Sequence, residues 1–159
     1  MQDLQSFLSN IVRLWSIHHY REDLYKKTLA LHDLGPLRRV FSQGYASSLL
    51  YKKEVQWVYD FSKSTLYDGD IHQYAAKKEQ FASELVTQEK PFVIRKIMEL
   101  ESKTIKVYQS LLGQPNIGYD AVSILNDHLA KLNDINNKLK KEINKDSIDQ
   151  NPKRMITLI

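Results

Sequence analysis

The chain has 159 residues and a mass of 18.6 kDa, the size of a single domain with a core of its own. It contains no cysteine, which excludes disulfide bonds, thiolate metal sites and cysteine nucleophiles. Its formal charge of +4 is mildly basic, no apolar run approaches the roughly 20 residues of a membrane span, and the first residues lack the basic start of a signal peptide. We therefore expect a soluble, cytoplasmic protein without membrane contact.

The first predicted element is a long amphipathic helix. Its inward positions recur every three or four residues, which keeps one face turned toward a core. They are Leu4, Leu8, Ile11, Trp15, His18, Glu22, Tyr25 and Leu29. The segment "HDLGP" at 32–36 then ends the helix, and Pro36 suits the first position of the next one.

The second predicted helix covers residues 36–62. Its inward positions are Leu37, Phe41, Gly44, Ser48, Tyr51, Val55 and Val58. Gly44 and Ser48 lie one turn apart, which indicates close packing against a neighbouring helix. The aromatic residues of this helix cannot all lie on that inner face, so some are either exposed for protein contacts or covered by the segment that follows. They include Tyr45, Trp57, Tyr59 and Phe61.

A long connection and two further helices follow. The connection contains a short helix for which Asp70 is the candidate N-cap, with apolar positions at Ile71, Tyr74, Phe81 and Leu85. The third long helix covers 91–112, with inward positions Ile94, Ile97, Met98, Glu101, Ile105, Tyr108 and Leu112. The fourth is capped by Asp120 and carries Leu125, His128, Leu129, Leu132, Ile135, Leu139 and Ile143.

This order of elements predicts an all-α fold, because no segment shows the period-two alternation of a strand. Two helices, a long connection and two more helices are typical of a ferritin-like four-helix bundle with one crossover between helices two and three. A simple up-down bundle is the alternative. We expect residues 1–145 to form the bundle domain and residues 146–159 to form a C-terminal tail, whose last residues "MITLI" dock on the bundle or on a partner.

Four polar residues interrupt the inward stripes near the middle of their helices: His18, Glu22, Glu101 and His128. Carboxylates and imidazoles converging in a bundle interior are the donors of a divalent metal site, for iron or manganese. Di-iron bundles, however, use Glu-x-x-His motifs, and no histidine of this chain has a glutamate three residues earlier. The second helix offers only Glu54, about two turns from the level of His18.

The same four residues also fit a purely structural interpretation, which we favour. Buried polar groups must be paired. A His18–Glu22 or Glu101–His128 pair would satisfy its own hydrogen bonds, and Tyr51 and Tyr108 could add further partners. No glycine-rich phosphate loop, serine elbow or calcium loop accompanies them, so the sequence identifies no catalytic residue.

Several segments resemble an uncharacterised bacterial family of ferritin-like domains, a domain of unknown function. In "VIRKIMELESKTIKVYQSLL", Glu101 and Tyr108 fill the places of a glutamate and a tyrosine seven residues apart. "LYKKTLAL" followed by "LRRVF" is similar to the first hairpin of that family, and "IHQYAAKKEQFASEL" to its connecting helix. The resemblance covers roughly residues 4–143 and implies a ferritin-like bundle without a settled activity.

Three functions remain open at this point. We favour a non-enzymatic bundle that acts through protein contacts, above all self-association into a homo-oligomer. The alternative is a metal-binding ferritin-like protein with a degenerate site at His18, Glu22, Glu101 and His128. Nucleic-acid binding through the lysine-rich segment 131–145 ranks third, because its lysines alternate with Asn, Asp and Glu and no arginine cluster accompanies them.

Overall fold

The computed structural model describes residues 2–63, 90–114 and 117–150 of the chain. These residues form four long helices, α1 (Gln2–Leu29), α2 (Leu37–Lys63), α5 (Lys90–Leu112) and α6 (Tyr119–Gln150), and no strand occurs among them. The prediction of an all-α four-helix bundle is confirmed. No helix of this described part is long and apolar enough to cross a membrane.

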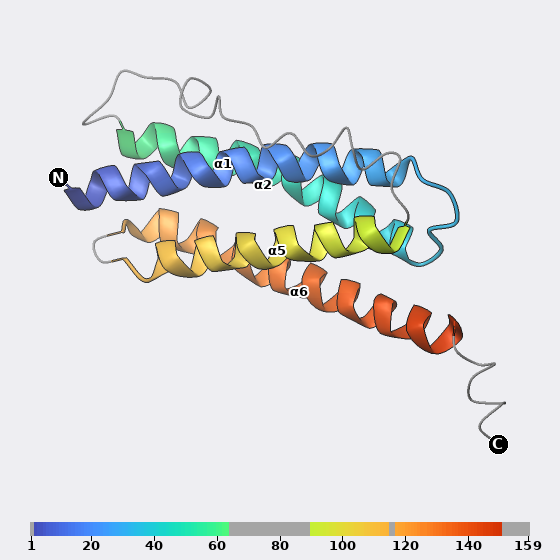
Figure 1. Cartoon of the computed structure of the whole chain (residues 1–159). Helices are drawn as coiled ribbons and strands as arrows, with labels where there is room; N and C mark the ends of the chain where they lie inside the picture. Colours follow the sequence, from blue (N-terminus) through green and yellow to red (C-terminus); the bar gives the residue numbers. More distant parts are fainter. Residues whose placement is uncertain (1, 64–89, 115–116, 151–159) are drawn as a thin grey trace.

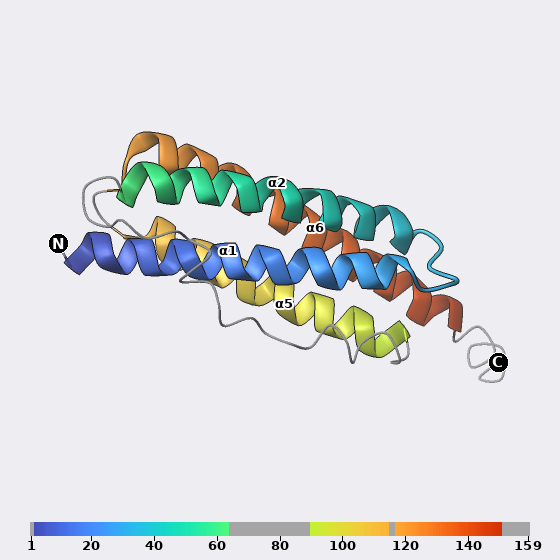
Figure 2. The same ribbon diagram turned by 90° about the horizontal axis from the view of Figure 1, so that it is seen from above.

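The helices form two antiparallel hairpins that pack side by side (Figure 1). α1 pairs with α2 and α5 with α6, while α1 also lies against α5 and α2 against α6. Figures 1 and 2 show that α1 and α6 run in one direction and α2 and α5 in the other. The end of α2 and the start of α5 therefore lie at opposite ends of the bundle.

The inward positions predicted for α2 are all buried, from Leu37 to Val58. Gly44 allows the close approach that its sequence position suggested, because a Cβ atom there would overlap the ring of Tyr25 on α1. α5 and α6 follow their predicted stripes as well, although Met98, Leu112, Leu129 and Ile143 are only partly buried.

The turn between α1 and α2 has two residues in the left-handed region, Asp33 with φ 59° and Gly35 with φ 56°. Leu34 between them is buried and anchors the turn in the core. The guanidinium of Arg38 donates hydrogen bonds to the carbonyls of Leu29 and Leu31, which satisfies acceptors left open at the end of α1. The chain reverses here with few residues, as "HDLGP" predicted, and Pro36 directly precedes α2.

Two predicted boundaries differ from the structure. The amide of Val122 bonds to the carbonyl of Gly118, so α6 begins before Asp120, which lies inside the first turn. A carboxylate there still interacts favourably with the helix dipole. α6 also continues to Gln150, beyond the point where we placed the start of the tail. The predicted short helix with Asp70 and the terminal segment 155–159 lie outside the described residues.

Candidate functional site

Three of the four predicted site residues meet in the middle of the bundle. His18 from α1 and Glu101 from α5 are fully buried, and His128 from α6 is 1% exposed. Glu22 does not join them: its carboxylate lies at the edge of α1, where it accepts a bond of 2.6 Å from the Lys52 ammonium of α2. The buried face of α1 includes Arg21, Leu24 and Thr28, because this helix contacts both α2 and α5.

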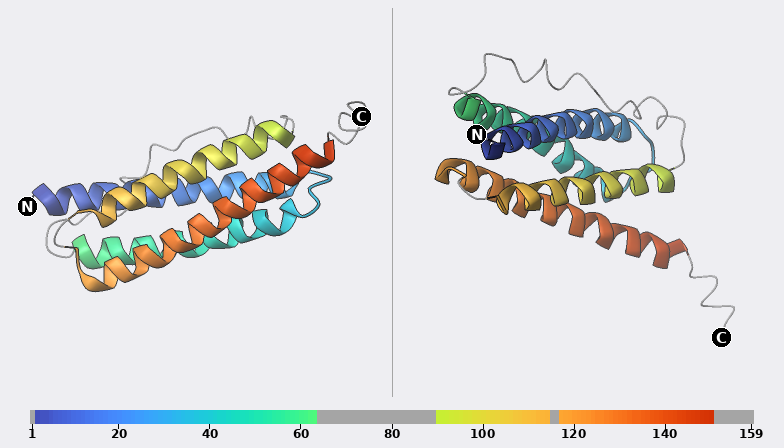
Figure 3. Two further views of the ribbon diagram at one scale, coloured as in Figure 1. Left: turned by 90° about the horizontal axis from the view of Figure 1, so that it is seen from below. Right: turned by 60° about the vertical axis from the view of Figure 1, so that its left-hand side comes forward.

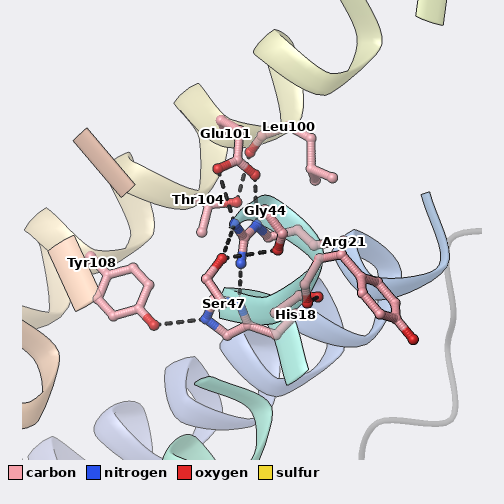
Figure 4. Close-up of polar contacts among 10 residues, drawn as sticks. His18, Arg21, Gly44, Ser47, Leu100, Glu101, Thr104 and Tyr108 are labelled. Atoms are coloured by element: carbon pink, nitrogen blue, oxygen red, sulfur yellow. Dashed lines mark hydrogen bonds and ion pairs between the residues drawn. The ribbon is translucent and has the colours of Figure 1, made fainter. Parts of the chain in front are cut away.

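The largest fully buried side chain is one that sequence reasoning missed, Arg21. Its Nε donates to Oε1 of Glu101 at 2.6 Å, and one terminal nitrogen donates to Oε2 at 3.2 Å (Figure 4). Both side chains of this ion pair are fully buried. A fork of two charge-assisted hydrogen bonds is stronger than a pair of neutral ones and fixes the relative orientation of the two groups.

Arg21 also organises the residues around it. It donates to Oγ of Ser47 on α2 at 3.1 Å, and Ser47 donates in turn to the carbonyl of Gly44 at 2.9 Å. A third bond of 3.0 Å joins a terminal nitrogen of Arg21 to Nδ1 of His18. Arg21 thus links α1 to α2 and α5, and we call His18, Arg21, Ser47, Glu101, Tyr108 and His128 the core network.

With both imidazoles neutral and the Glu54 carboxylate ionised, the hydrogen bonds of the core network have one consistent direction. Arginine can only donate, so Nδ1 of His18 must accept and the proton of this imidazole lies on Nε2. Nε2 then donates to the Tyr108 hydroxyl at 2.7 Å. The hydroxyl donates to Nδ1 of His128, also at 2.7 Å, which leaves the His128 proton on Nε2.

The chain of bonds ends near the surface. Nε2 of His128 donates to Oε1 of Glu54 at 3.4 Å, and the Glu54 side chain is 37% exposed. Helix α2 therefore does contribute a carboxylate, although to His128 rather than at the level of His18. The Tyr51 ring stacks on the His128 imidazole at 3.8 Å between centroids, which fixes the orientation of that ring.

The electrostatics keep both imidazoles neutral. Burial, with Arg21 and His128 adding repulsion, holds the pKa of His18 well below its usual 6.5. Burial and the positive charge of Arg21 lower the pKa of His128 to about 3. Burial also raises the pKa of Tyr108 well above 10, so its hydroxyl stays protonated. Burial alone lowers the pKa of Arg21, but the Glu101 carboxylate raises it by more, and the network carries one cation and one anion.

The geometry bears directly on the predicted metal site. Among the described residues, no three histidine, aspartate or glutamate side chains are grouped so that they could hold a metal ion. The Arg21 guanidinium occupies the place beside Glu101 and His18 where a cation would lie. The four-residue metal site, including Glu22, stays a prediction, and the structure gives it no additional ligand.

The chemistry open to this arrangement is narrow. Four of the five N–H donor positions of Arg21 are used inside the bundle, and each imidazole nitrogen of His18 and His128 has a partner. The surface groove along α5 and the one between α2 and α6 include no residue of the core network. The network is therefore best described as an internal connection between the four helices.

Comparison with known proteins adds no relative: no family model, no curated protein and no solved structure matches this chain.

Proposed function

We propose that this chain is a non-enzymatic, ferritin-like helical bundle that acts through protein contacts, in the first place with a second copy of itself. The supporting observation is an apolar face on α2. Leu50, Trp57 and Phe61 are 53%, 48% and 67% exposed, although the rest of that helix follows an ordinary core pattern. Exposed aromatic side chains of this kind are enriched at protein interfaces.

The three residues lie on one side of α2. Their spacing of seven and four residues brings them to the same face of a helix. The rings of Trp57 and Phe61 stack at 5.5 Å with an angle of 14°, which holds the two side chains together as one apolar cluster. Their neighbours Lys53 and Asp60 carry opposite charges on exposed positions, which favours an antiparallel pairing of two α2 helices.

The ferritin-like part of the proposal is supported by the helix directions. α2 and α5 run the same way, so the end of α2 and the start of α5 lie at opposite ends of the bundle, as in the bundle topology with one long crossover (Figure 1). An up-down bundle would place the end of α2 beside the start of α5. Membership of the uncharacterised bacterial family rests on the sequence resemblance alone.

The test is the oligomeric state as a function of concentration, measured by sedimentation velocity. We expect a reversible homo-oligomer, and Trp57→Gln should weaken its association at least tenfold, because aromatic anchors contribute about 2 kcal/mol or more at an interface. Tyr119→Gln is the matched control, since Tyr119 is 85% exposed but lies on α6 and not on α2. A protein that stays monomeric at high concentration contradicts self-association.

The alternative, a protein that binds iron or manganese through His18, Glu22, Glu101 and His128, has less support. Glu101 is already paired with Arg21, and Glu22 with Lys52. The deciding measurement is the content of iron, manganese and zinc in protein purified without a histidine tag. Stoichiometric metal that disappears in Glu101→Ala would establish the alternative; a protein that cannot be loaded with metal would end it.

A further inference from the structure

A groove of about 560 Å³ lies between the start of α2 and the later turns of α6. Figure 3 shows these two helices beside each other at the end of the bundle where α2 begins. The groove is lined by Pro36, Arg39, Val40 and Gln43 on one side and Lys138, Lys141 and Glu142 on the other. Its volume lies in the range of small-molecule sites.

The charged residues of this groove differ in whether they already have partners. Lys138 donates to Oδ2 of Asp134 at 3.0 Å and to Oε1 of Gln43 at 3.2 Å. Glu142 lies 3.5 Å from the Lys145 ammonium. Within the described parts of the chain, the side chains of Arg39 and Lys141 make neither a hydrogen bond nor an ion pair.

Among the described residues, two unpaired cations thus line one groove, Arg39 from the α2 side and Lys141 from the α6 side. A planar guanidinium binds a phosphate oxygen pair in fork geometry, while an ammonium adds a point charge. Val40, which is buried, and Pro36 also line the groove, so it offers apolar contact as well. We propose that this groove binds a small phosphorylated molecule, with its phosphate between Arg39 and Lys141 and its apolar part against Val40 and Pro36.

A nucleic acid fits the groove less well. Binding to a duplex requires a row of cations that follows many phosphates. Here the carboxylates of Asp134 and Glu142 lie among the lysines of α6 and would repel an extended polyanion. Of these two carboxylates only Glu142 lines the groove, and the Lys145 ammonium 3.5 Å away offsets its charge toward a confined ligand with one phosphate. This inference concerns the junction of α2 and α6 and does not depend on self-association or on the apolar face of α2.

The experiment is a titration of the ¹⁵N-labelled full chain with phenyl phosphate at constant ionic strength, followed by amide chemical shifts. We expect saturable shifts grouped around Arg39, Gln43 and Lys141. Inorganic phosphate, which lacks an apolar part, should bind at the same place but more weakly. Phenol at equal concentration reports contact by the apolar part alone and should produce no saturable shift there.

Matched variants test the assignment of the two cations. Arg39→Gln and Lys141→Gln should each weaken phenyl phosphate binding about tenfold, as expected for loss of a charge-assisted hydrogen bond. Lys140→Gln removes the same charge one residue away, on an exposed position that does not line the groove, and should change the affinity less than twofold. The spectra themselves show whether each variant is folded.

Three outcomes overturn the proposal. One is the absence of saturable shifts up to roughly 10 mM phenyl phosphate, a concentration about tenfold above the Kd expected for a weak ligand. Another is an equal loss of affinity in Lys140→Gln, which would indicate general attraction by the positive charge of the protein instead of a defined site. The last is a protein that does not bind phenyl phosphate but binds duplex DNA tightly and with a steep salt dependence. That result assigns the groove to a polyanion instead.

Discussion

Two ion pairs involve neighbouring residues of α1 and have the same N···O distance. Arg21 reaches Glu101 at 2.6 Å, and Glu22, the next residue, is reached by Lys52 at 2.6 Å. The first pair is fully buried, whereas the side chains of the second are 22% and 21% exposed. Water replaces a broken contact in the second pair but cannot do so in the first. Burial rather than distance therefore decides what each pair contributes.

The largest effect is expected from Arg21→Met. The Glu101 carboxylate would remain buried without a cation, which costs about 3–5 kcal/mol of unfolding free energy. Urea denaturation followed by circular dichroism measures the change. In the double variant Arg21→Met/Glu101→Leu no charge is left unpaired, and at least half of the loss should be recovered. A double variant as unstable as the single one would contradict this account.

Tyr108→Phe is expected to cost about 2–3 kcal/mol, because Nε2–H of His18 and Nδ1 of His128 would both lose their partner in the core. The same denaturation experiment applies. Imidazole ¹⁵N shifts of the wild-type protein check the underlying geometry, since both histidines should carry their proton on Nε2. Either ring with its proton on Nδ1 would show that the direction derived from Arg21 is wrong.

Acid should destabilise the protein through the buried imidazoles. The pKa of His128 is about 3 when folded against an ordinary 6.5, so the unfolded chain binds more protons as the pH falls below about 6.5. Between pH 7.5 and 5 this lowers the free energy of unfolding by about 2 kcal/mol for that residue. His128→Gln should make the pH dependence correspondingly flatter.

The control for this pH experiment is His32→Gln, because His32 is exposed in the turn between α1 and α2. Its pH dependence should match that of the wild-type protein. If His128→Gln and His32→Gln behave alike, the buried imidazole does not account for the acid sensitivity.

The smallest effect is expected from Glu22→Gln, below about 1 kcal/mol, since a partly exposed pair gains little over its hydrated ions. Added salt should reduce even this difference. A loss of unfolding free energy comparable to that of Arg21→Met would place the Glu22 carboxylate in the core, together with His18, Glu101 and His128.

The fold was predictable from the sequence to the extent that apolar spacing determines it. The buried stripe of α2 follows its predicted positions because nearly all of them are apolar or small, and Gly44 indicated the close approach of Tyr25. Helix directions also followed from the short connections within each hairpin. The ends of α6 were less predictable, because the polar residues there are compatible both with a further helical turn and with the end of the helix.

The candidate site was predictable only in part. His18, Glu101 and His128 interrupt apolar stripes and are buried, as expected. Arg21 carried no such signal, because a long cationic side chain normally extends to solvent and its position is next to the stripe rather than on it. Glu22 occupies a position predicted to face inward, but its carboxylate lies at the edge of α1 and is bonded to Lys52. Only the placement of α5 across from α1 identifies Glu101 as the partner of Arg21.

The one-way order of hydrogen bonds also determines how protons could move through the bundle. A proton wire conducts only if every member can take up a proton from behind after passing one forward. Here the first member is a guanidinium, which has no lone pair to accept and whose pKa is raised further by Glu101. A proton lost at Glu54 could not be replaced from the interior. The row of imidazoles and hydroxyl therefore does not conduct protons, and the protons of His18 and Tyr108 should exchange with water only when the helices separate.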